Sequence, residues 1–269
     1  MSDILQQNIL LSCVHNQHYG TEQLVPHHVL GIIISGVMEV FTSEGTIFLE
    51  PGSIGVMRKN TLLKTKKHPS ADGKPFKSIS LFLTEDELKS FALKNNIPGQ
   101  ERFTENPLFE IPKKGLFAGF FQSVIPYFDQ PDYFTPSIAA LKTNEAIELL
   151  LQLNRSFFLP YLFDFSQPYK IDLEGFMRKN FLFNIPLSEF ARLSGRSLST
   201  FKRDFSRIFR ETPEKWLKQQ RLQEAKSLLQ STELRPSDVY LLVGFENFSH
   251  FSNAFKNYFG YNASLVPNS

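Results

Sequence analysis

The sequence predicts an α+β protein in which an antiparallel β domain is followed by an all-α domain. The chain has 269 residues, which is more than one typical domain holds. Short strand-like runs separated by turn residues occupy residues 24–83, whereas nearly every apolar pattern after Asp172 has a helical period. We therefore expect two domains of different class, residues 1–165 and 166–269.

The N-terminal strands are predicted from apolar or alternating runs that recur about every 8–10 residues. Turn residues such as Ser35-Gly36 and Pro51-Gly52 separate the runs. This spacing favours a small antiparallel barrel or sandwich. The predicted strands are residues 29–34, 37–42, 46–49, 54–57, 62–66 and 77–83.

Three helices are predicted after the strands. Thr84 is a suitable N-cap and three acidic residues follow it, so a helix should extend to about residue 95. Residues 115–127 and 135–153 carry apolar side chains at three- and four-residue steps, as helices that cover a barrel or pair with a second subunit do. Residues 159–171 contain two prolines and no sustained period, which predicts a linker.

The C-terminal hundred residues predict helices throughout. Thr212 as N-cap, Pro213 at the first helical position and Glu214 in the first turn mark one start clearly. The predicted helices are residues 172–181, 187–194, 198–209, 213–230, 236–243 and 247–259.

Composition excludes several classes of protein. Hydrophobic residues make up 42% and charged residues 21% of the chain, which is typical of a globular fold and excludes wholesale disorder. There is no apolar run of about 18 residues and no basic start before an apolar stretch, so we expect neither a membrane span nor a secretory signal. Cys13 is the single cysteine, which excludes a disulfide framework and a Cys-rich zinc site. We expect a cytoplasmic protein with no membrane association.

Charge is divided unevenly along the chain. Residues 1–170 hold 15 Lys and Arg against 17 Asp and Glu, whereas residues 171–269 hold 14 against 10. The excess of positive charge in the helical domain is a mild indication of a polyanionic partner there.

One helical arrangement occurs twice, at residues 186–209 and 235–259. Each copy has a short helix, a turn containing Gly195 or Gly244, and a longer helix with phenylalanines on one side. The arrangement is that of a helix-turn-helix, in which the second helix enters the DNA major groove and the first braces it. The matching phenylalanines, offset by 50 residues, are Phe201, Phe205, Phe209, Phe251, Phe255 and Phe259.

Residues 176–260 resemble the AraC/XylS family of transcriptional regulators. The most specific match is Gly244-Phe245-Glu246, followed by Ser249, Phe251, Phe255, Lys256 and Phe259-Gly260. The helix between the two copies carries the pattern Arg221, Ala225 and Leu228-Leu229. Upstream, the match includes Leu187, Ala191, Leu193, Ser197, Phe201, Arg203 and Phe205. The resemblance implies a double-stranded DNA partner, with RNA polymerase as a further candidate partner.

The residues expected to contact DNA lie on the second helix of each copy. Small and polar residues at the start of that helix can approach base edges, whereas basic residues can neutralise phosphates. The candidate DNA-binding residues are Ser197, Ser199, Thr200, Lys202, Arg203, Arg207, Asn247, Ser249, His250, Asn253 and Lys256.

Three positions depart from the family pattern. Arg210 occupies a position where the family usually has glycine, and we expect a left-handed backbone there. Tyr240 replaces a small residue at which the helices of the second copy should cross closely, and Ala263 replaces a proline. These departures concern the detailed packing of the second copy more than the assignment.

The N-terminal half resembles the cupin-like barrel and paired helices that precede such DNA-binding domains. The matching features are residues 36–40, Leu49-Glu50-Pro51-Gly52 and the helix at 141–153. The resemblance implies a domain that senses an effector, either a small molecule or a protein, and that forms a homodimer. The candidate dimerisation residues are Leu141, Leu150 and Leu153.

No cofactor or metal is expected in the N-terminal half. Metal-binding cupins use a His-x-His pair with a further Glu and His. Here His27 and His28 are adjacent, so they would point to opposite faces of a strand, and His68 falls in a Lys-rich loop. Nucleotide-binding and nucleophile-elbow motifs are absent from the sequence.

The sequence therefore predicts a sequence-specific DNA-binding transcriptional regulator and not an enzyme. The alternative is a cupin-type enzyme or ligand-binding module whose helical domain mediates assembly. Salt-dependent binding to duplex DNA would distinguish the two.

Overall fold

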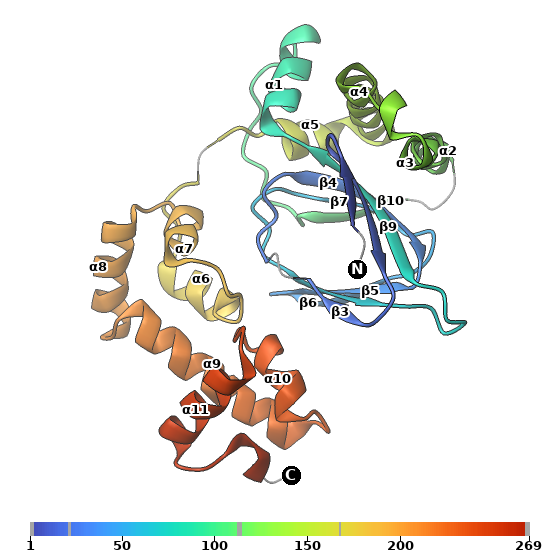
Figure 1. Ribbon diagram of the computed structural model, residues 1–269. Coiled ribbons are helices and arrows are strands. Elements are labelled where there is room, and N and C mark those ends of the chain that lie inside the picture. Colours follow the sequence, from blue (N-terminus) through green and yellow to red (C-terminus); the bar gives the residue numbers. More distant parts are fainter. Residues whose placement is uncertain (1–2, 21–22, 112–114, 167, 267–269) are drawn as a thin grey trace. The chain divides into compact units, whose positions relative to one another are not determined.

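A computed structural model describes residues 3–20, 23–111, 115–166 and 168–266 of the chain. The chain divides into an N-terminal domain, Met1–Ser166, and a C-terminal domain, Gln167–Ser269 (Figure 1). All described strands belong to the first domain, and the described elements of the second are helices, which confirms the predicted α+β class.

The strands of the N-terminal domain form two antiparallel sheets. One sheet has the strand order β1-β2-β9-β4-β7-β10 and the other the order β3-β8-β5-β6. The strands are β1 (Ile4–Gln6), β2 (Ile9–Val14), β3 (His18–Tyr19), β4 (His28–Ser35), β5 (Val37–Thr42), β6 (Gly45–Leu49), β7 (Ile54–Met57), β8 (Lys64–His68), β9 (Phe76–Leu83) and β10 (Leu108–Ile111).

The six predicted strands correspond to β4–β9, and the sequence reading missed β1, β2, β3 and β10. Three of the missed strands, β2, β3 and β10, depend on pairing with distant segments, whereas β1 forms a short hairpin with β2. Strand β2 pairs along its whole length with β9, from Ile9 opposite Leu81 to Val14 opposite Phe76. Strand β10 pairs with β7, with Phe109 opposite Val56. Such partners lie far apart in the sequence and leave no local periodic signal.

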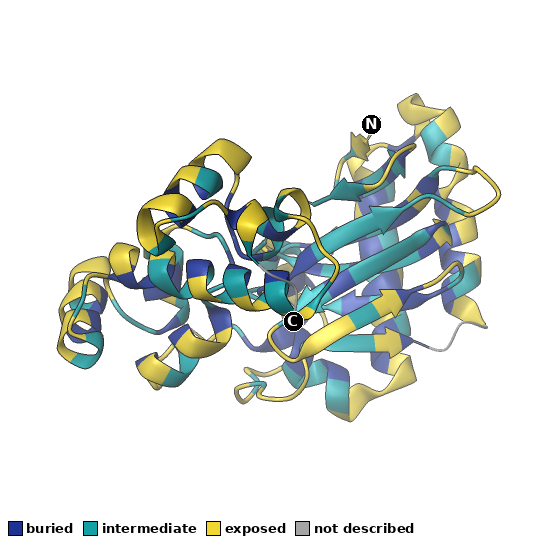
Figure 2. Cartoon of the chain, turned by 90° about the horizontal axis from the view of Figure 1, so that it is seen from below, coloured by how far each residue is buried: buried dark blue, intermediate teal, exposed yellow. Residues whose placement is uncertain are grey.

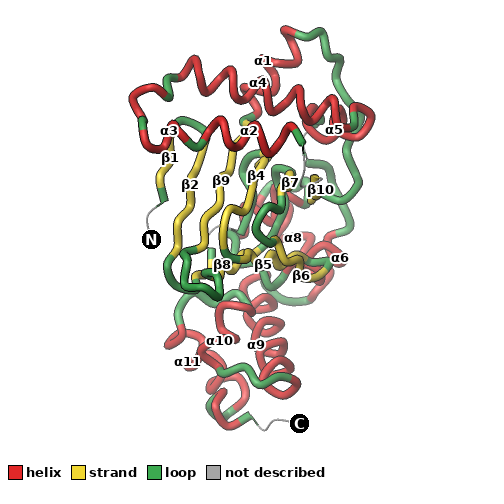
Figure 3. Tube along the Cα trace, turned by 90° about the vertical axis from the view of Figure 1, so that its right-hand side faces the viewer, coloured by secondary structure: helices red, strands yellow, loops and turns green. Residues whose placement is uncertain are grey.

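Helices pack on the six-stranded sheet (Figure 3). They are α1 (Glu85–Lys94), α2 (Leu116–Val124), α3 (Pro126–Asp129), η1 (Pro131–Tyr133), α4 (Pro136–Leu153) and α5 (Arg155–Phe163). Thr84 caps α1, as the sequence predicted, and it does so in a capping box with Glu87. The stretch predicted as one helix at 115–127 is two helices, because Pro126 has no amide hydrogen with which to continue α2.

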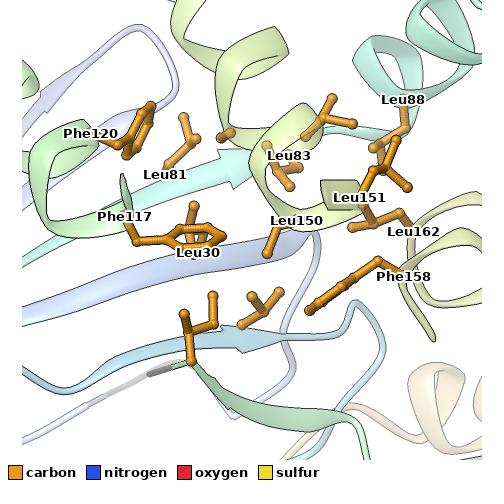
Figure 4. Packing of buried hydrophobic residues seen from close by; sticks show 14 of the residues in the cluster. Leu30, Leu81, Leu83, Leu88, Phe117, Phe120, Leu150, Leu151, Phe158 and Leu162 are labelled. Carbon is orange, nitrogen blue, oxygen red and sulfur yellow. The ribbon is translucent and has the colours of Figure 1, made fainter. Parts of the chain in front are cut away.

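The main core lies between this sheet and its helices. Sheet residues Leu30 and Leu81 pack with Phe120 of α2 and Leu150 of α4, as Figure 4 shows. Burying each such side chain stabilises the fold by about 1.5–3 kcal/mol. A second cluster, which includes Ile33, Val40 and Phe76, joins residues of the two sheets.

Helix α5 corrects the predicted linker at residues 159–171. Asn154 caps α5 by accepting a hydrogen bond from the Phe157 amide, and the helix continues through Pro160 to Phe163. Phe158, Tyr161 and Phe163 are completely or almost completely buried. The burial of these aromatic side chains outweighs the helix-breaking tendency of Pro160.

The C-terminal domain contains α6 (Leu173–Asn180), α7 (Leu187–Leu193), α8 (Leu198–Phe209), α9 (Pro213–Ser231), α10 (Pro236–Leu242), α11 (Phe248–Phe259) and η2 (Ala263–Leu265). The six predicted helices match α6–α11 to within about one residue. Figure 2 shows buried residues on one side of these helices and exposed residues on the other. No helix among the described residues is both long and apolar enough to cross a membrane.

Two separate cores support the C-terminal domain. Phe201 and Phe205 of α8 pack with Phe190 and Trp216 in one cluster. Phe251 and Phe255 of α11 pack with Leu222, Val239 and other residues in a second cluster. Helix α9 contributes its first turns to one cluster and its last turns to the other, so it joins two small helical units. We call α7–α8 the first unit and α10–α11 the second unit.

Candidate nucleic-acid interface

In the first unit, the turn before α8 requires glycine. Gly195 has a φ of +69°, and a Cβ built there would lie 2.0 Å from the carbonyl carbon of Tyr169. Helix α8 then begins after its N-cap Ser197, whose hydroxyl accepts a hydrogen bond from the Thr200 amide at 3.3 Å. The tight turn and the cap together fix the direction in which α8 leaves the turn.

The second unit repeats this construction with different residues. Gly244 has a φ of +86°, and a Cβ there would lie 2.6 Å from the Leu182 carbonyl oxygen. Asn247 caps α11, and its Oδ1 accepts a hydrogen bond from the His250 amide at 3.1 Å. Asn247 and Ser197 were predicted as DNA contacts; both are exposed N-caps, a role that the sequence analysis did not assign.

The remaining candidate DNA-binding residues are carried on the outer faces of α8 and α11. Phe201, Phe205, Phe251 and Phe255 are fully buried, so the opposite face of each helix points away from its core. Every candidate residue is exposed except Thr200, which is half-buried. The exposed set on the two helices is Ser199, Lys202, Arg203, Arg207, Ser249, His250, Asn253 and Lys256.

A buried carboxylate organises the charge of α8. Asp204 is 4% exposed, and its Oδ2 accepts a hydrogen bond from Arg196 Nε at 3.2 Å. Arg203 and Arg207 each lie 3.8 Å from Asp204 Oδ1, although their side chains are 76% and 73% exposed. Burial raises the pKa of Asp204, but the hydrogen bond from Arg196 and the charges of Lys170 and Arg207 outweigh burial and bring the pKa below its usual value. The carboxylate stays ionised and lies beneath the two exposed arginines of the outer face.

The side chain of Lys202, a residue of α8, extends toward Glu214 at the start of α9. Its Nζ is 3.3 Å from Glu214 Oε1, and both side chains are about half exposed. An exposed pair of this kind contributes little to stability and can be exchanged for a phosphate oxygen. Lys202 is therefore available to an anion that approaches α8.

The backbone at Arg210 has the predicted left-handed conformation. Its φ and ψ are 60° and 17°, and its amide donates a hydrogen bond to the Ser206 carbonyl as the C-cap of α8. In the second unit, Gly260 occupies the same position with a φ of 83°. The first unit therefore carries backbone strain that the second unit avoids.

The side chain of Tyr240 packs beside α11. Its ring centroid lies 5.7 Å from that of Phe248 in an edge-on arrangement, and the side chain packs against the second core from a half-buried position. The equivalent Ala191 in the first unit is 1% exposed. Ala263 is buried at the start of η2, where it also packs into the second core.

The three candidate dimerisation leucines do not share one face of α4. Leu150 is fully buried in the core of its own domain, whereas Leu141 and Leu153 are 63% and 39% exposed. The three leucines therefore cannot form one contact surface, because nine residues separate Leu141 from Leu150 and place them on opposite sides of a helix. Leu141 and Leu153 stay available for contact with another chain.

A largely apolar cavity of about 460 Å³ lies within the N-terminal domain. Its lining includes Leu10 and Ser12 of β2, Ile32 of β4, Met38 of β5 and Lys67 of β8. Lys67 Nζ donates a hydrogen bond to Ser12 Oγ at 2.7 Å, and burial lowers the pKa of the Lys67 ammonium. The cavity thus combines apolar walls with the Lys67 ammonium and the Asp3 carboxylate, whose charge partly opposes the effect of burial on the pKa of Lys67.

The histidines do not assemble a metal site in the described part of the chain, where no group of three or more His, Cys, Asp or Glu side chains could hold an ion. His28 is buried, and burial together with the Arg58 and Lys59 charges lowers its pKa well below the usual value. His68 was expected in a loop but ends strand β8, where its Nε2 lies 2.8 Å from Glu39 Oε2.

Two family descriptions match the chain. A helix-turn-helix domain matches residues 190–266, and the ExsA N-terminal regulatory domain matches residues 28–159. The chain is 24% identical over 242 residues to the HTH-type transcriptional regulator ExsA of Pseudomonas aeruginosa, and this match covers 85% of the chain and 82% of that protein.

Two further similarities are one to a protein sequence and one to a solved structure. The chain is 27% identical over 164 residues to the thermoregulatory protein LcrF of Yersinia pestis, which covers 60% of the chain and 60% of that protein. Among solved structures, an apo form of a ToxT variant from Vibrio cholerae aligns with 97% of the chain and 96% of its own length at 11% identity and a TM-score of 0.47.

Proposed function

Since the chain belongs to the AraC/XylS family of DNA-binding transcriptional regulators, we propose that α8 and α11 together read one operator. The two helices would enter successive major-groove faces about 34 Å apart, on the same side of the duplex. One observation supports this most strongly. The same helix-turn-helix arrangement occurs twice, and each copy has a buried phenylalanine face and an exposed polar face.

The exposed residues would divide between phosphates and bases. Arg203, Arg207 and Lys256 carry the charge that phosphate oxygens require, and such contacts fix the register of a protein on DNA. His250 and Asn253 offer donors and acceptors suited to base edges. A transcriptional regulator must share a compartment with the DNA that it binds. We therefore propose that the protein is located in the cytoplasm.

Titrating duplex DNA with the purified protein over a range of salt concentrations tests the proposal. We expect binding to random duplex at low salt, with affinity that falls steeply as salt rises. Selection from random duplexes, or recovery of bound genomic fragments, should yield a motif of two parts about one helical turn apart. Binding without salt dependence, or a motif with a single part, would contradict the proposed mode.

We propose further that the protein forms a homodimer through the exposed face of α4. Leu141 and Leu153 are the large apolar side chains of α4 that are exposed. Sedimentation of Leu141→Glu should show a monomer if the proposal holds, whereas an unchanged dimer mass would exclude this face. Leu150→Glu is unsuitable as a test, because it would place a charge in the core of the domain.

The cavity in the N-terminal domain is the proposed effector site. Its apolar lining and the ammonium of Lys67 suit a small apolar molecule with an anionic group, although the Asp3 carboxylate in the same lining would compete for that ammonium. A panel of such molecules should raise the melting temperature of the wild-type protein more than that of Lys67→Met. If no compound in the panel shifts the melting temperature, a protein effector becomes the better hypothesis.

The alternative is an enzyme or ligand-binding module whose helices mediate assembly. Turnover of a small molecule that depends on added metal would favour it. A regulator should instead recruit or exclude RNA polymerase, which transcription in vitro from a selected operator would detect.

A further inference from the structure

A partly buried arginine connects the segment before the first unit of the C-terminal domain to the second unit. Arg221 lies near the middle of α9 and donates hydrogen bonds in three directions. Its Nε bonds to the Phe181 carbonyl at 2.8 Å, its Nη2 to the Phe183 carbonyl at 2.9 Å, and its Nη1 to the Gly244 carbonyl at 3.1 Å. Phe181 and Phe183 belong to the segment between α6 and α7, whereas Gly244 lies in the turn of the second unit.

The segment between α6 and α7 also contacts the second unit through residues other than Arg221. Leu182 packs against the second core, and its carbonyl lies where a Cβ on Gly244 would clash. Asn184 accepts a hydrogen bond from Arg221 Nη1 at 3.3 Å and donates one to Glu246 Oε1 at 2.6 Å. The turn before α11, which sets the direction of that helix, therefore contacts the segment before α7 directly. We call these contacts, together with the hydrogen bonds of Arg221, the joint.

The chemistry of this joint depends on a guanidinium group. Burial lowers the pKa of Arg221 to about 10, and the charge of Glu246 opposes that shift, so the side chain stays charged at neutral pH. A guanidinium that is largely removed from water must keep its N–H groups hydrogen-bonded. The carbonyl oxygens around it must in turn accept a hydrogen bond. Lysine has a single ammonium and cannot reach acceptors on opposite sides, whereas the planar guanidinium has five donors.

We propose that Arg221 is a positioning residue that fixes the angle and separation of α8 and α11, and thereby sets the half-site spacing that the protein accepts. The inference rests on the proposed binding of one operator by both helices. Each inserted base pair moves one half-site by about 3.4 Å and rotates it by about 34–36° around the duplex. A rigid joint cannot follow that displacement, whereas a loosened joint can.

The test compares the selected operator with versions that carry one or two extra base pairs between the half-sites. The full-length wild type, Arg221→Lys and Arg221→Met are titrated with each duplex. We expect one insertion to weaken wild-type binding by about tenfold or more, as a lost specific contact does. The same insertion should weaken binding of either Arg221 variant by about threefold or less.

Leu229→Ala is the matched control for simple loss of stability. Leu229 is 4% exposed in the second core and makes none of the joint's hydrogen bonds, so its truncation should lower the melting temperature. This variant should keep the wild-type response to the insertion. If the Arg221 variants also keep that response while their affinity falls on every duplex, Arg221 is only a stabilising residue and the proposal is wrong.

A second measurement does not need DNA. Spin labels on Ser206→Cys in α8 and Asn257→Cys in α11, both exposed positions, report the distance between the helices after Cys13→Ser. We expect the distance distribution to broaden in folded Arg221→Lys and to stay narrow in Leu229→Ala. An unchanged distribution in folded Arg221→Lys would overturn the inference. A wild type that fails to bind DNA would refute the proposed function, while this measurement would still test the joint.

Discussion

The two helix-turn-helix units are alike in packing and different in charge. Helices α8 and α11 each have 12 residues, a polar N-cap, a buried phenylalanine face and a left-handed C-cap. Their exposed faces diverge. Helix α8 carries Lys202, Arg203 and Arg207, whereas Lys256 is the basic residue of α11. The two units thus share a fold, whereas the chemistry of their outer faces differs.

The two units also differ at one buried position. Asp204 in α8 is buried among basic side chains, and the matching position in α11 is Ala254. The first unit therefore has an internal carboxylate that arranges its charges, and the second has only apolar packing at that point. We infer that the first unit supplies most of the phosphate contacts and the second contributes mainly polar contacts to bases.

Because the two units pack alike, matching substitutions in their two cores should have the largest effects, and these effects are on stability. Phe205→Ala and Phe255→Ala remove matching side chains that are both fully buried, so each should lower the free energy of unfolding by about 3–5 kcal/mol. Denaturant unfolding followed by tryptophan fluorescence measures the loss. Trp216 is the single tryptophan of the chain and packs against Phe205 and Phe209 in the first core.

This arrangement also tests whether the units unfold together. If α9 and Arg221 couple them, Phe255→Ala should shift the Trp216 transition as much as Phe205→Ala does. A transition that moves only with Phe205→Ala would mean that the two cores are independent.

The difference in charge predicts unequal loss of DNA binding. Lys202→Ala/Arg203→Ala should weaken operator binding by about 2–4 kcal/mol and reduce the salt slope by up to about two phosphate contacts. His250→Ala/Asn253→Ala should cost less and leave the slope almost unchanged, because neither residue adds a permanent positive charge. Titrations of one operator at several salt concentrations give both quantities. A larger loss of affinity and slope from the second pair would reverse the ranking of the units.

Much of this comparison could be predicted from the sequence. The helix periods, the glycine turns and the phenylalanine offset depend on local order, and the helices at 198–209 and 213–230 were located within a residue or two. The left-handed backbone at Arg210 was expected from the resemblance, because the family usually has glycine at that position.

Long-range partners could not be predicted. Asp204 looks like any polar residue on a helix, and only the fold brings Arg196 and Lys170 to it. Arg221 belonged to a recognised pattern, but nothing local indicated that its acceptors lie at Phe181 and Gly244. Strand β2 and helix α5 were missed for the same reason, since their stability comes from packing against distant segments.

The smallest predicted effect concerns the two C-caps. A left-handed conformation costs a residue with a Cβ about 1–2 kcal/mol, and Arg210 adopts it while Gly260 adopts it without that cost. Arg210→Gly should therefore stabilise the first unit, although the greater freedom of glycine in the unfolded chain offsets up to about 1 kcal/mol. We expect a net gain of about 0.5–1 kcal/mol. Gly260→Ala is the matched control, because its Cβ would meet no atom within 4 Å and any loss must come from the backbone. Thermal unfolding measures both changes, at roughly 4–8 °C per kcal/mol for a domain of this size. A lower melting temperature for Arg210→Gly would show that the arginine side chain contributes more than its backbone costs, and the two C-caps would then differ in function as well as in strain.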